Sequence, residues 1–306
     1  MLQLITTLGA KSQGDLAGPI LPHEHVFVDL RTWDQPGYGE AEPAAVVALM
    51  APEIERARRA GIVAIVEPGA VGVGRRADIL RAVSEATGFP LVAPTGVYRE
   101  PWLPPWVRDA ENDTLTAWMI GELTGQIEES GVRAGWIKVG ATDDGLTAAE
   151  TKVLRAAAKA SAATGSALGS HTIRGRVALD QIGVIERAGG DPGRFVWIHA
   201  HQEQDFAWHR RAAERGAWLE YDGIGEPGTD KRFVSWILRA LDAGCGDQLL
   251  LSHDRGWYDP AQPGGGTPRP FTYLSEVFLP LLSAAGVEDA TIARLTRDNP
   301  FRAFAR

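Results

Sequence analysis

Two histidines near the start of the chain are spaced as a pair of metal ligands in a strand would be. His23 and His25 lie in the apolar run PILPHEHVFV, on either side of Glu24. Residues i and i+2 of a strand point to the same face, so both imidazoles could bind one object. Two unrelated structural or surface histidines would explain an isolated pair equally well. Polar residues elsewhere in the chain must therefore decide its role.

Four further polar side chains end short β-branched runs. They are Lys138 in GWIKVG, His171 in GSHT, His199 in VWIHAH and Asp254 in LLLSHD. Successive members are separated by one repeat of a strand and a helix, or by two repeats before Asp254. If the runs are strands of one parallel barrel, all these groups reach the same rim. Several imidazoles and a carboxylate at one place suit Zn²⁺ or a similar divalent ion.

Lys138 is chemically the odd member of this set. A divalent cation would repel a protonated ammonium, whereas burial beside a metal favours the neutral amine. A neutral amine can take up CO2 as a carbamate, whose two oxygens could bridge two metal ions. Two divalent ions, a carbamate, Asp254 and one hydroxide sum to a charge of about +1. The alternative, a lysine that extends into solvent, is disfavoured by its neighbours Trp136, Ile137 and Val139.

The intervening residues predict a regular alternation of strands and helices. Alanine-rich stretches with charges at helical spacing precede short β-branched runs that end in glycine or a polar turn. The predicted strands are 19–28, 62–69, 90–98, 134–140, 166–172, 194–201, 217–223 and 247–254, and the helices are 42–61, 74–88, 111–131, 147–165, 176–190, 204–216 and 230–244. Strict alternation of this length predicts a (β/α)8 TIM barrel, an α/β fold. We expect one domain over 1–306, with a short hairpin within residues 1–15.

A dinucleotide-binding sheet is the alternative α/β fold. It needs a glycine-rich turn directly after the first strand. The run GAVGVGRR at 69–76 matches that spacing only loosely and follows the second predicted strand. We therefore interpret it as a tight turn between a strand and a helix.

The composition points to small-molecule chemistry. The 306 residues are 44% hydrophobic and 23% charged, with a formal net charge of -8. No dense block of Lys and Arg indicates a nucleic-acid or polybasic membrane contact. No run approaches the roughly 20 apolar residues of a membrane span. A single cysteine, Cys245, excludes an intrachain disulfide and is interpreted as a small buried residue. We expect a cytoplasmic protein with a small-molecule substrate.

The combined motifs resemble the phosphotriesterase family of the amidohydrolase superfamily, including its lactonase-like members. PHEH, WIKVG, GSHT, WIHAH, LLSHD and the C-terminal DNPFRAF carry this resemblance, in order, over nearly the whole chain. It implies two divalent metal ions, with Zn²⁺ favoured over Mn²⁺ or Co²⁺. His23, His25 and Asp254 would hold the more buried ion, and His171 and His199 the more exposed one. Carboxylated Lys138 and a hydroxide would bridge them.

Two positions depart from that family's pattern. His201 stands where paraoxon-hydrolysing relatives carry an acidic residue, and Gly223 stands where they carry a relay histidine. Specialised phosphotriester hydrolysis is therefore disfavoured. We favour His199 over His201 as the ligand, because it lies nearer the end of its strand. His253 is expected to be structural, and His209, next to two arginines, to lie on the surface.

The substrate-binding candidates lie in the loops at the same rim. They are Tyr98, Trp102, His201, Arg255 and Trp257. Tyr98 resembles the tyrosine that lactonase-like relatives place near the lactone carbonyl, where its phenol could donate a hydrogen bond. Arg99, Arg174 and Arg255 could instead hold an anionic substrate.

These features predict a hydrolase of lactones or related carboxylic esters, with phosphotriesterase activity as a side reaction. The metals would activate the hydroxide, and Asp254 would carry its proton to the leaving group. A true phosphotriesterase (aryldialkylphosphatase) is the first alternative, and a non-catalytic small-molecule binding barrel is the second. A homodimer is expected only by analogy with the fold.

Overall fold

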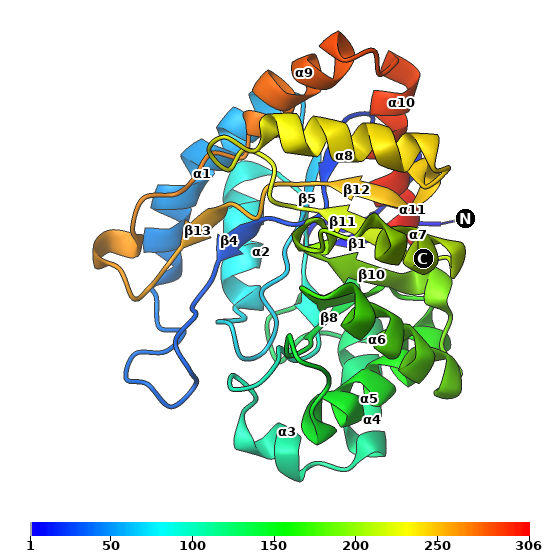
Figure 1. Ribbon diagram of the computed structural model, residues 1–306. Helices are drawn as coiled ribbons and strands as arrows, with labels where there is room; N and C mark the ends of the chain where they lie inside the picture. The colour runs from blue at the N-terminus through cyan, green and yellow to red at the C-terminus, as the bar shows by residue number, and fades with distance from the viewer. Residues whose placement is uncertain (1) are drawn as a thin grey trace.

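A short antiparallel hairpin opens the chain, as predicted. The computed structural model describes residues 2–306, beginning with β1 (Leu4–Thr6) and β2 (Gly9–Lys11). The two ends of the chain lie side by side, since Gln3 and Arg306 exchange two backbone hydrogen bonds of 3.0 Å (Figure 1). The hairpin and the C-terminal residues therefore lie at one end of the molecule.

Parallel strands form the predicted (β/α)8 TIM barrel, seen at the centre of Figure 1. Six of them run in chain order as β7 (Pro94–Thr95), β8 (Trp136–Gly140), β9 (Leu168–His171), β10 (Phe195–Ile198), β11 (Trp218–Tyr221) and β12 (Leu249–Leu251). Three more pair in the order β3 (Ile20–Leu21), β5 (Ala64–Val66) and β6 (Leu91–Val92). Only Ala93 separates β6 from β7, so these two belong to one barrel strand.

The first and last barrel strands meet at the carboxyl rim. There β4 (His25–Phe27) pairs in parallel with β13 (Gly256–Tyr258), with His25 opposite Gly256. The backbone N–H of Asp254 also donates to His23 O, at 3.2 Å. Residues more than two hundred positions apart in sequence are thereby brought together.

Helices cover the outside of the barrel. The principal ones are α1 (Pro43–Arg59), α2 (Ala77–Thr87), α4 (Asn112–Thr124), α5 (Ala148–Thr164), α6 (Gly175–Arg187), α7 (Phe206–Glu214) and α8 (Asp230–Asp242). Shorter elements are α3 (Pro105–Asp109), α9 (Leu279–Ala284), α10 (Asp289–Ala293), α11 (Asn299–Phe304), π-helical Leu274–Phe278 and Arg294–Asp298, and the 3-10 turns Gln13–Asp15, Pro192–Arg194, Ala200–Gln202, Gly246–Gln248 and Pro263–Gly265.

Helix ends follow local chemistry. Thr147 caps α5 by accepting a hydrogen bond from the backbone N–H of Glu150 at 3.1 Å, and Gly165 ends it in the left-handed conformation. The prediction of helix over 111–131 was wrong beyond Thr124. Gly125 leaves the helical region there, with φ -109° and ψ -110°, so the chain turns instead.

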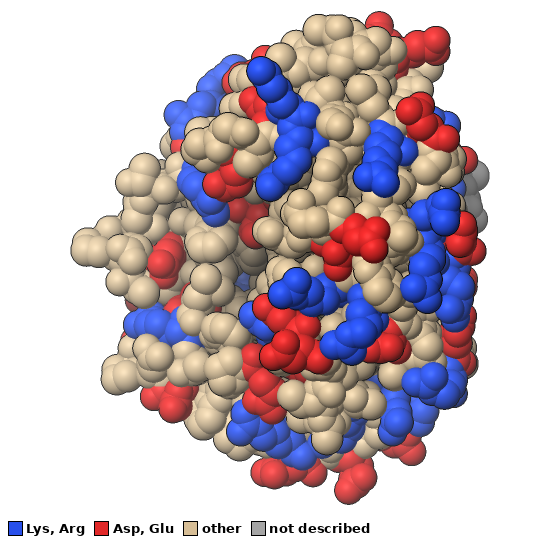
Figure 2. Space-filling model, viewed as in Figure 1, with Lys and Arg blue, Asp and Glu red and all other residues tan. Residues whose placement is uncertain are grey.

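Alternation along the strands separates the barrel interior from the layer beneath the helices. On β10, Val196 and Ile198 pack in the inner apolar cluster, whereas Phe195 and Trp197 pack in the outer one. On β8, Trp136 packs inside and Ile137 outside, so the same period turns Lys138 inward. On the face drawn in Figure 2, cationic and anionic side chains are interspersed. Among the described residues, no helix is long and apolar enough to cross a membrane.

Candidate active site

Most of the predicted site residues line one cavity at the carboxyl rim. Its volume is about 170 Å³, and its walls include His23, His25, Tyr98, Lys138, His171, His199, Asp254 and Trp257. The remaining wall is apolar and consists of Val28, Leu30, Pro68 and Val73. A larger hollow of about 530 Å³ lies along α8 and contains none of the predicted residues. We therefore place the candidate site by its chemistry and not by its volume.

His25 presents one ring nitrogen to the cavity because a carboxylate holds the other. Its Nδ1 lies 3.0 Å from Oε1 of Glu67, a carboxylate that also accepts backbone N–H bonds from Val26 and Gly69. A carboxylate that accepts all these bonds requires the proton on Nδ1, so the Nε2 lone pair is free. That Nε2 lies 3.5 Å from Asp254 Oδ1.

His199 is oriented in the same way. Asp222 accepts from its Nδ1 at 2.8 Å and from its backbone N–H at 3.1 Å. The residue has φ +62°, which ends the strand alternation after Ile198 and turns the ring toward the barrel centre. Burial alone would raise the pKa of Asp222, but the imidazoles of His199, His201 and His23 together outweigh it and hold that pKa well below its usual value.

His23 has a more deeply buried partner. Its Nδ1 lies 2.7 Å from Glu220 Oε1, and both side chains are almost fully buried. Burial raises the pKa of Glu220 well above its usual value, and neighbouring Asp222 adds to the effect. On the other side of the ring, Nε2 lies 3.8 Å from Asp254 Oδ1.

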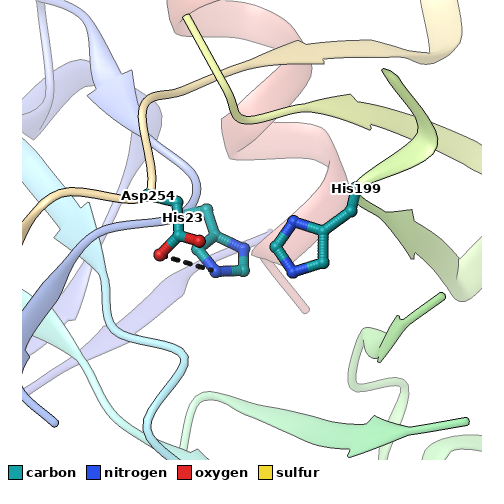
Figure 3. Close-up of side chains that lie close together, drawn as sticks. All are labelled: His23, His199 and Asp254. Atoms are coloured by element: carbon teal, nitrogen blue, oxygen red, sulfur yellow. Dashed lines mark ion pairs between the residues drawn. The ribbon is translucent and has the colours of Figure 1, made fainter. Parts of the chain in front are cut away.

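His23, His199 and Asp254 converge on one point. One ligand atom from each lies within 4.8 Å of the others, as a shared metal ion would require. Figure 3 shows the imidazole of His199 directed toward His23 and Asp254 from the opposite side. His23, Glu220 and Asp222 form a second group that meets the same criterion.

Two buried atoms at this point lack hydrogen-bond partners among the described residues. They are His171 Nε2 and Asp254 Oδ1. Unpaired polar atoms are costly inside a protein. An imidazole nitrogen and a carboxylate oxygen left unpaired beside two free imidazole nitrogens are suitable ligands for a cation. The residues present therefore fit a metal centre.

Lys138 lies among these groups and is 3% exposed. Burial lowers its pKa, although the carboxylates of Glu220 and Asp254 oppose the shift. Burial also lowers the pKa of His23 and of His171 well below the usual value, with smaller effects from neighbouring cations. At neutral pH both imidazoles are accordingly neutral, the state in which histidine binds metals.

Three of the five substrate-binding candidates lie outside the cavity walls. Trp102 packs on Tyr98 and donates its Nε1–H to Leu30 O at 2.8 Å. Arg255 donates to Gly225 O and stacks over Tyr273. His201 is buried against Phe233, and its Nδ1 lies 3.1 Å from Asp222 Oδ1 without the direction of a hydrogen bond.

The other two candidates, Tyr98 and Trp257, do form part of the walls. Burial raises the pKa of Tyr98 to about 12, so its phenol keeps its proton. Trp257 Nε1 is buried and has no partner among the described residues.

Positive charge is scarce around this cavity. Arg99 pairs with Asp143 at 3.1 Å, Arg174 is exposed on its loop, and neither residue lines the walls. Lys138 supplies the one cationic group among the lining side chains. The arrangement does not favour the anionic-substrate alternative.

The prediction that His209 lies on the surface was wrong. It is fully buried and donates Nε2–H to Glu203 O at 3.0 Å, while Nδ1 accepts from the Tyr221 hydroxyl at 2.7 Å. Helical spacing explains this, because Phe206, His209 and Ala213 form the inner face of α7. His253 and Cys245 are buried, as expected.

The sequence assigned no role to the supporting carboxylates Glu67, Glu220 and Asp222. The usable signal was an acidic residue inside an otherwise apolar strand, in IVEPG and in WLEYD. Alternation along β11 places Glu220 and Asp222 on the same inward face. A buried strand carboxylate needs a partner, and the nearest candidates were the predicted ligands.

Known proteins match this chain over most of its length. The model of the phosphotriesterase family matches residues 2–304. An aryldialkylphosphatase of Saccharolobus solfataricus is 29% identical over 83% of this chain and 84% of its own. A phosphotriesterase homology protein of Mycobacterium tuberculosis is 29% identical over 100% and 98%. A mutant PTE-like lactonase of Deinococcus radiodurans superposes with a TM-score of 0.86 at 30% identity, covering 98% of this chain and 99% of that one.

The family model spans all eight barrel strands and every residue of the cavity wall. The chain belongs to the phosphotriesterase family, whose members are hydrolases.

Proposed function

We propose that this protein hydrolyses lactones or related uncharged carboxylic esters with the help of two divalent metal ions. The observation that carries the proposal is the convergence of free imidazole nitrogens, Asp254 and a buried lysine on one small cavity. His25 and His199 are fixed by carboxylates on Nδ1, an arrangement typical of metal-binding histidines. The same groups would serve no purpose in a purely apolar pocket.

We assign His23, His25 and Asp254 to one ion and His171 and His199 to the other. Lys138, as a carbamate formed from its neutral amine and CO2 with loss of one proton, would contribute an oxygen to each. Cations in the cavity would also favour ionised Glu220, which would keep the proton of His23 on Nδ1. Zn²⁺ suits this set of nitrogen and oxygen ligands, and Mn²⁺ or Co²⁺ are further candidates.

When bound, such a pair of ions would lower the pKa of a water and polarise the ester carbonyl. Asp254 is suited to take up the proton of that water and pass it to the leaving alkoxide, because it lines the cavity and keeps a second carboxylate oxygen, Oδ2, when Oδ1 holds a cation. The Tyr98 hydroxyl would donate to a substrate oxygen, since its pKa of about 12 keeps it protonated. Trp257 Nε1 would supply a second donor, since it has no partner among the described residues.

The walls support a small, uncharged substrate. Val28, Leu30, Pro68 and Val73 provide an apolar surface, and about 170 Å³ accommodates a compact acyl group. A phosphotriester, with its three substituents, would fit into this space less easily. Lactones and simple esters therefore rank before phosphotriesters in this proposal.

Purified protein would be assayed with a neutral lactone, an aryl ester, a dialkyl aryl phosphotriester and an anionic ester of similar size. We expect turnover of the lactone and aryl ester that disappears on chelation and returns with Zn²⁺, Mn²⁺ or Co²⁺. Preference for the phosphotriester would favour the first alternative, a true phosphotriesterase. Absence of turnover in metal-loaded protein would favour a binding barrel.

Metal analysis of Lys138→Met tests the assignment of the lysine. We expect about two ions per chain in the wild type and clearly fewer in the variant, because a carbamate can no longer form. Lys152→Met is the matched control, since Lys152 lies on α5 and bonds the carbonyls of Arg108 and Ala110. An unchanged metal content in Lys138→Met would remove Lys138 from the centre.

A further inference from the structure

The segment that carries Asp254 and Trp257 to the cavity has an unusual backbone. Three of its four residues have positive φ: Asp254 at +56°, Gly256 at +93° and Trp257 at +75°. This conformation is unfavourable for side chains other than glycine and persists only where surrounding contacts impose it. Some structure outside the segment must therefore hold it.

Glu24 provides that contact. Its side chain is fully buried. Oε1 accepts from the backbone N–H of His253 at 3.0 Å and from His253 Nδ1 at 2.6 Å, and lies 2.7 Å from Ser252 Oγ. Oε2 accepts from the backbone N–H of Arg255 at 2.7 Å. One carboxylate thus binds the backbone immediately before and immediately after Asp254.

His253 extends this contact to the other end of the loop. Because its Nδ1–H donates to Glu24, its Nε2 is an acceptor, and it receives the backbone N–H of Leu274 at 2.7 Å. Leu274 begins the π-helical segment that ends the loop 255–273. The two side chains consequently fix both ends of the loop that supplies Trp257 to the cavity wall.

We propose that Glu24 and His253 are a positioning pair for the active site. Neither lines the cavity. They act by holding Asp254 in its left-handed conformation and by fixing both ends of the 255–273 loop, which supplies Trp257 to the cavity wall. The kinetic part of this inference rests on the proposed hydrolase function, whereas the part that concerns the loop does not.

Glu24→Gln tests the pair by replacing one carboxylate oxygen with an NH2 group. The amide oxygen can keep the donors at Ser252 and His253, but the NH2 group then faces the N–H of Arg255, and that bond is lost. We expect hydrogen exchange of the amides in 255–273 to rise about tenfold, as loss of one buried hydrogen bond implies. We also expect kcat/KM to fall roughly 10- to 100-fold, with KM raised as Trp257 moves.

Glu53→Gln is the matched control. Glu53 is also a buried carboxylate, but it lies on α1 and pairs with Arg56, away from the cavity. We expect its exchange in 255–273 and its kinetic constants to match those of the wild type.

His253→Asn separates the two ends and replaces Glu24→Gln if that variant does not fold. Asparagine can still donate to Glu24 but has no atom where Nε2 accepts from Leu274. We expect faster exchange at Leu274 and in the adjoining part of the loop, with Arg255 still protected. Uniformly faster exchange over the whole barrel in both variants, without excess in 255–273, would overturn the inference. Because exchange needs no substrate, a wild type without turnover would contradict the proposed function and leave this result readable.

Discussion

Two histidines, ten positions apart, show how this barrel separates an imidazole that faces the candidate site from one that supports the fold. The two histidines are held by two successive residues at the end of β11, Tyr221 and Asp222. Asp222 points inward and binds His199 Nδ1 at 2.8 Å, whereas Tyr221 points outward and binds His209 Nδ1 at 2.7 Å. Strand alternation therefore sends one supporting group to the cavity and the other to the helical layer.

The second ring nitrogen distinguishes them. In His209 it donates to Glu203 O, so both nitrogens are used within the fold. In His199 the Nε2 atom is left facing the cavity, close to His23 and Asp254. His209 is fully buried and the side chain of His199 is 12% exposed, and the difference that matters for chemistry is an unused lone pair.

Replacing each histidine by asparagine should give the largest contrast. His199→Asn can keep the bond to Asp222 while removing Nε2, so we expect metal content to fall and turnover to drop about 10³-fold, or about 4 kcal/mol in activation free energy. His209→Asn should leave metal content and kcat/KM unchanged and lower the melting temperature. Steady-state kinetics and metal analysis on both variants measure this. Equal losses of activity in the two would contradict the distinction.

His209 should contribute to the acid dependence of stability. Burial lowers its pKa from 6.5 to about 4. The unfolded chain therefore binds this proton more readily than the folded one, and the native state loses stability as pH falls from about 6.5 toward 4. The full shift corresponds to about 3 kcal/mol. Denaturant unfolding of wild type and His209→Asn between pH 7 and 4 measures it, and the variant should lose less stability over that range.

If wild type and His209→Asn lose the same stability between pH 7 and 4, the prediction for His209 is wrong. In that case other groups, among them the buried His23 and His171, would dominate the acid response. Chelated protein is used throughout, so that loss of metal at low pH does not contribute.

The sequence predicted the barrel and the cavity-lining set because both depend on periodic features. Strand and helix alternate with a regular repeat, and Lys138, His171 and Asp254 recur at strand ends, where parallel topology brings them to one rim. Local signals at the hairpin were equally clear. Each of these signals lies in a short stretch of sequence, and together they predict the barrel.

The supporting groups were less predictable because they depend on contacts between distant segments. Nothing near Glu220 in sequence shows that it will bind His23, and nothing near Glu24 shows that it will hold Arg255. His209 was misplaced because two neighbouring arginines outweighed the helical spacing that points it inward. The left-handed backbone at His199 also has no sequence signal. Glycine is the residue that usually indicates such a conformation, and this position is a histidine.

Asp222→Asn and Tyr221→Phe change the two supports directly. An asparagine amide can donate to His199 Nδ1, which would move the ring proton to Nε2 and remove the lone pair from the cavity. We expect metal affinity or activity to fall about 10- to 100-fold. Tyr221→Phe removes only the hydroxyl that donates to His209 and should cost about 1 kcal/mol of stability without affecting the metal. Metal titration and thermal unfolding of both variants distinguish the two roles.

Gly223→Ala tests whether His201 resembles His199, which faces the candidate site, or His209, which supports the fold. A Cβ at position 223 would lie 2.6 Å from His201 Nε2, so the ring must move. Because His201 packs on Phe233 outside the cavity walls, we expect a loss of roughly 1 to 2 kcal/mol in stability from overpacking, with kcat/KM nearly unchanged. Gly121→Ala is the control, since no atom lies within 4 Å of its Cβ and alanine should stabilise α4 by about 0.5 to 1 kcal/mol. A large loss of turnover in Gly223→Ala would instead group His201 with His199, as a residue whose position the reaction requires.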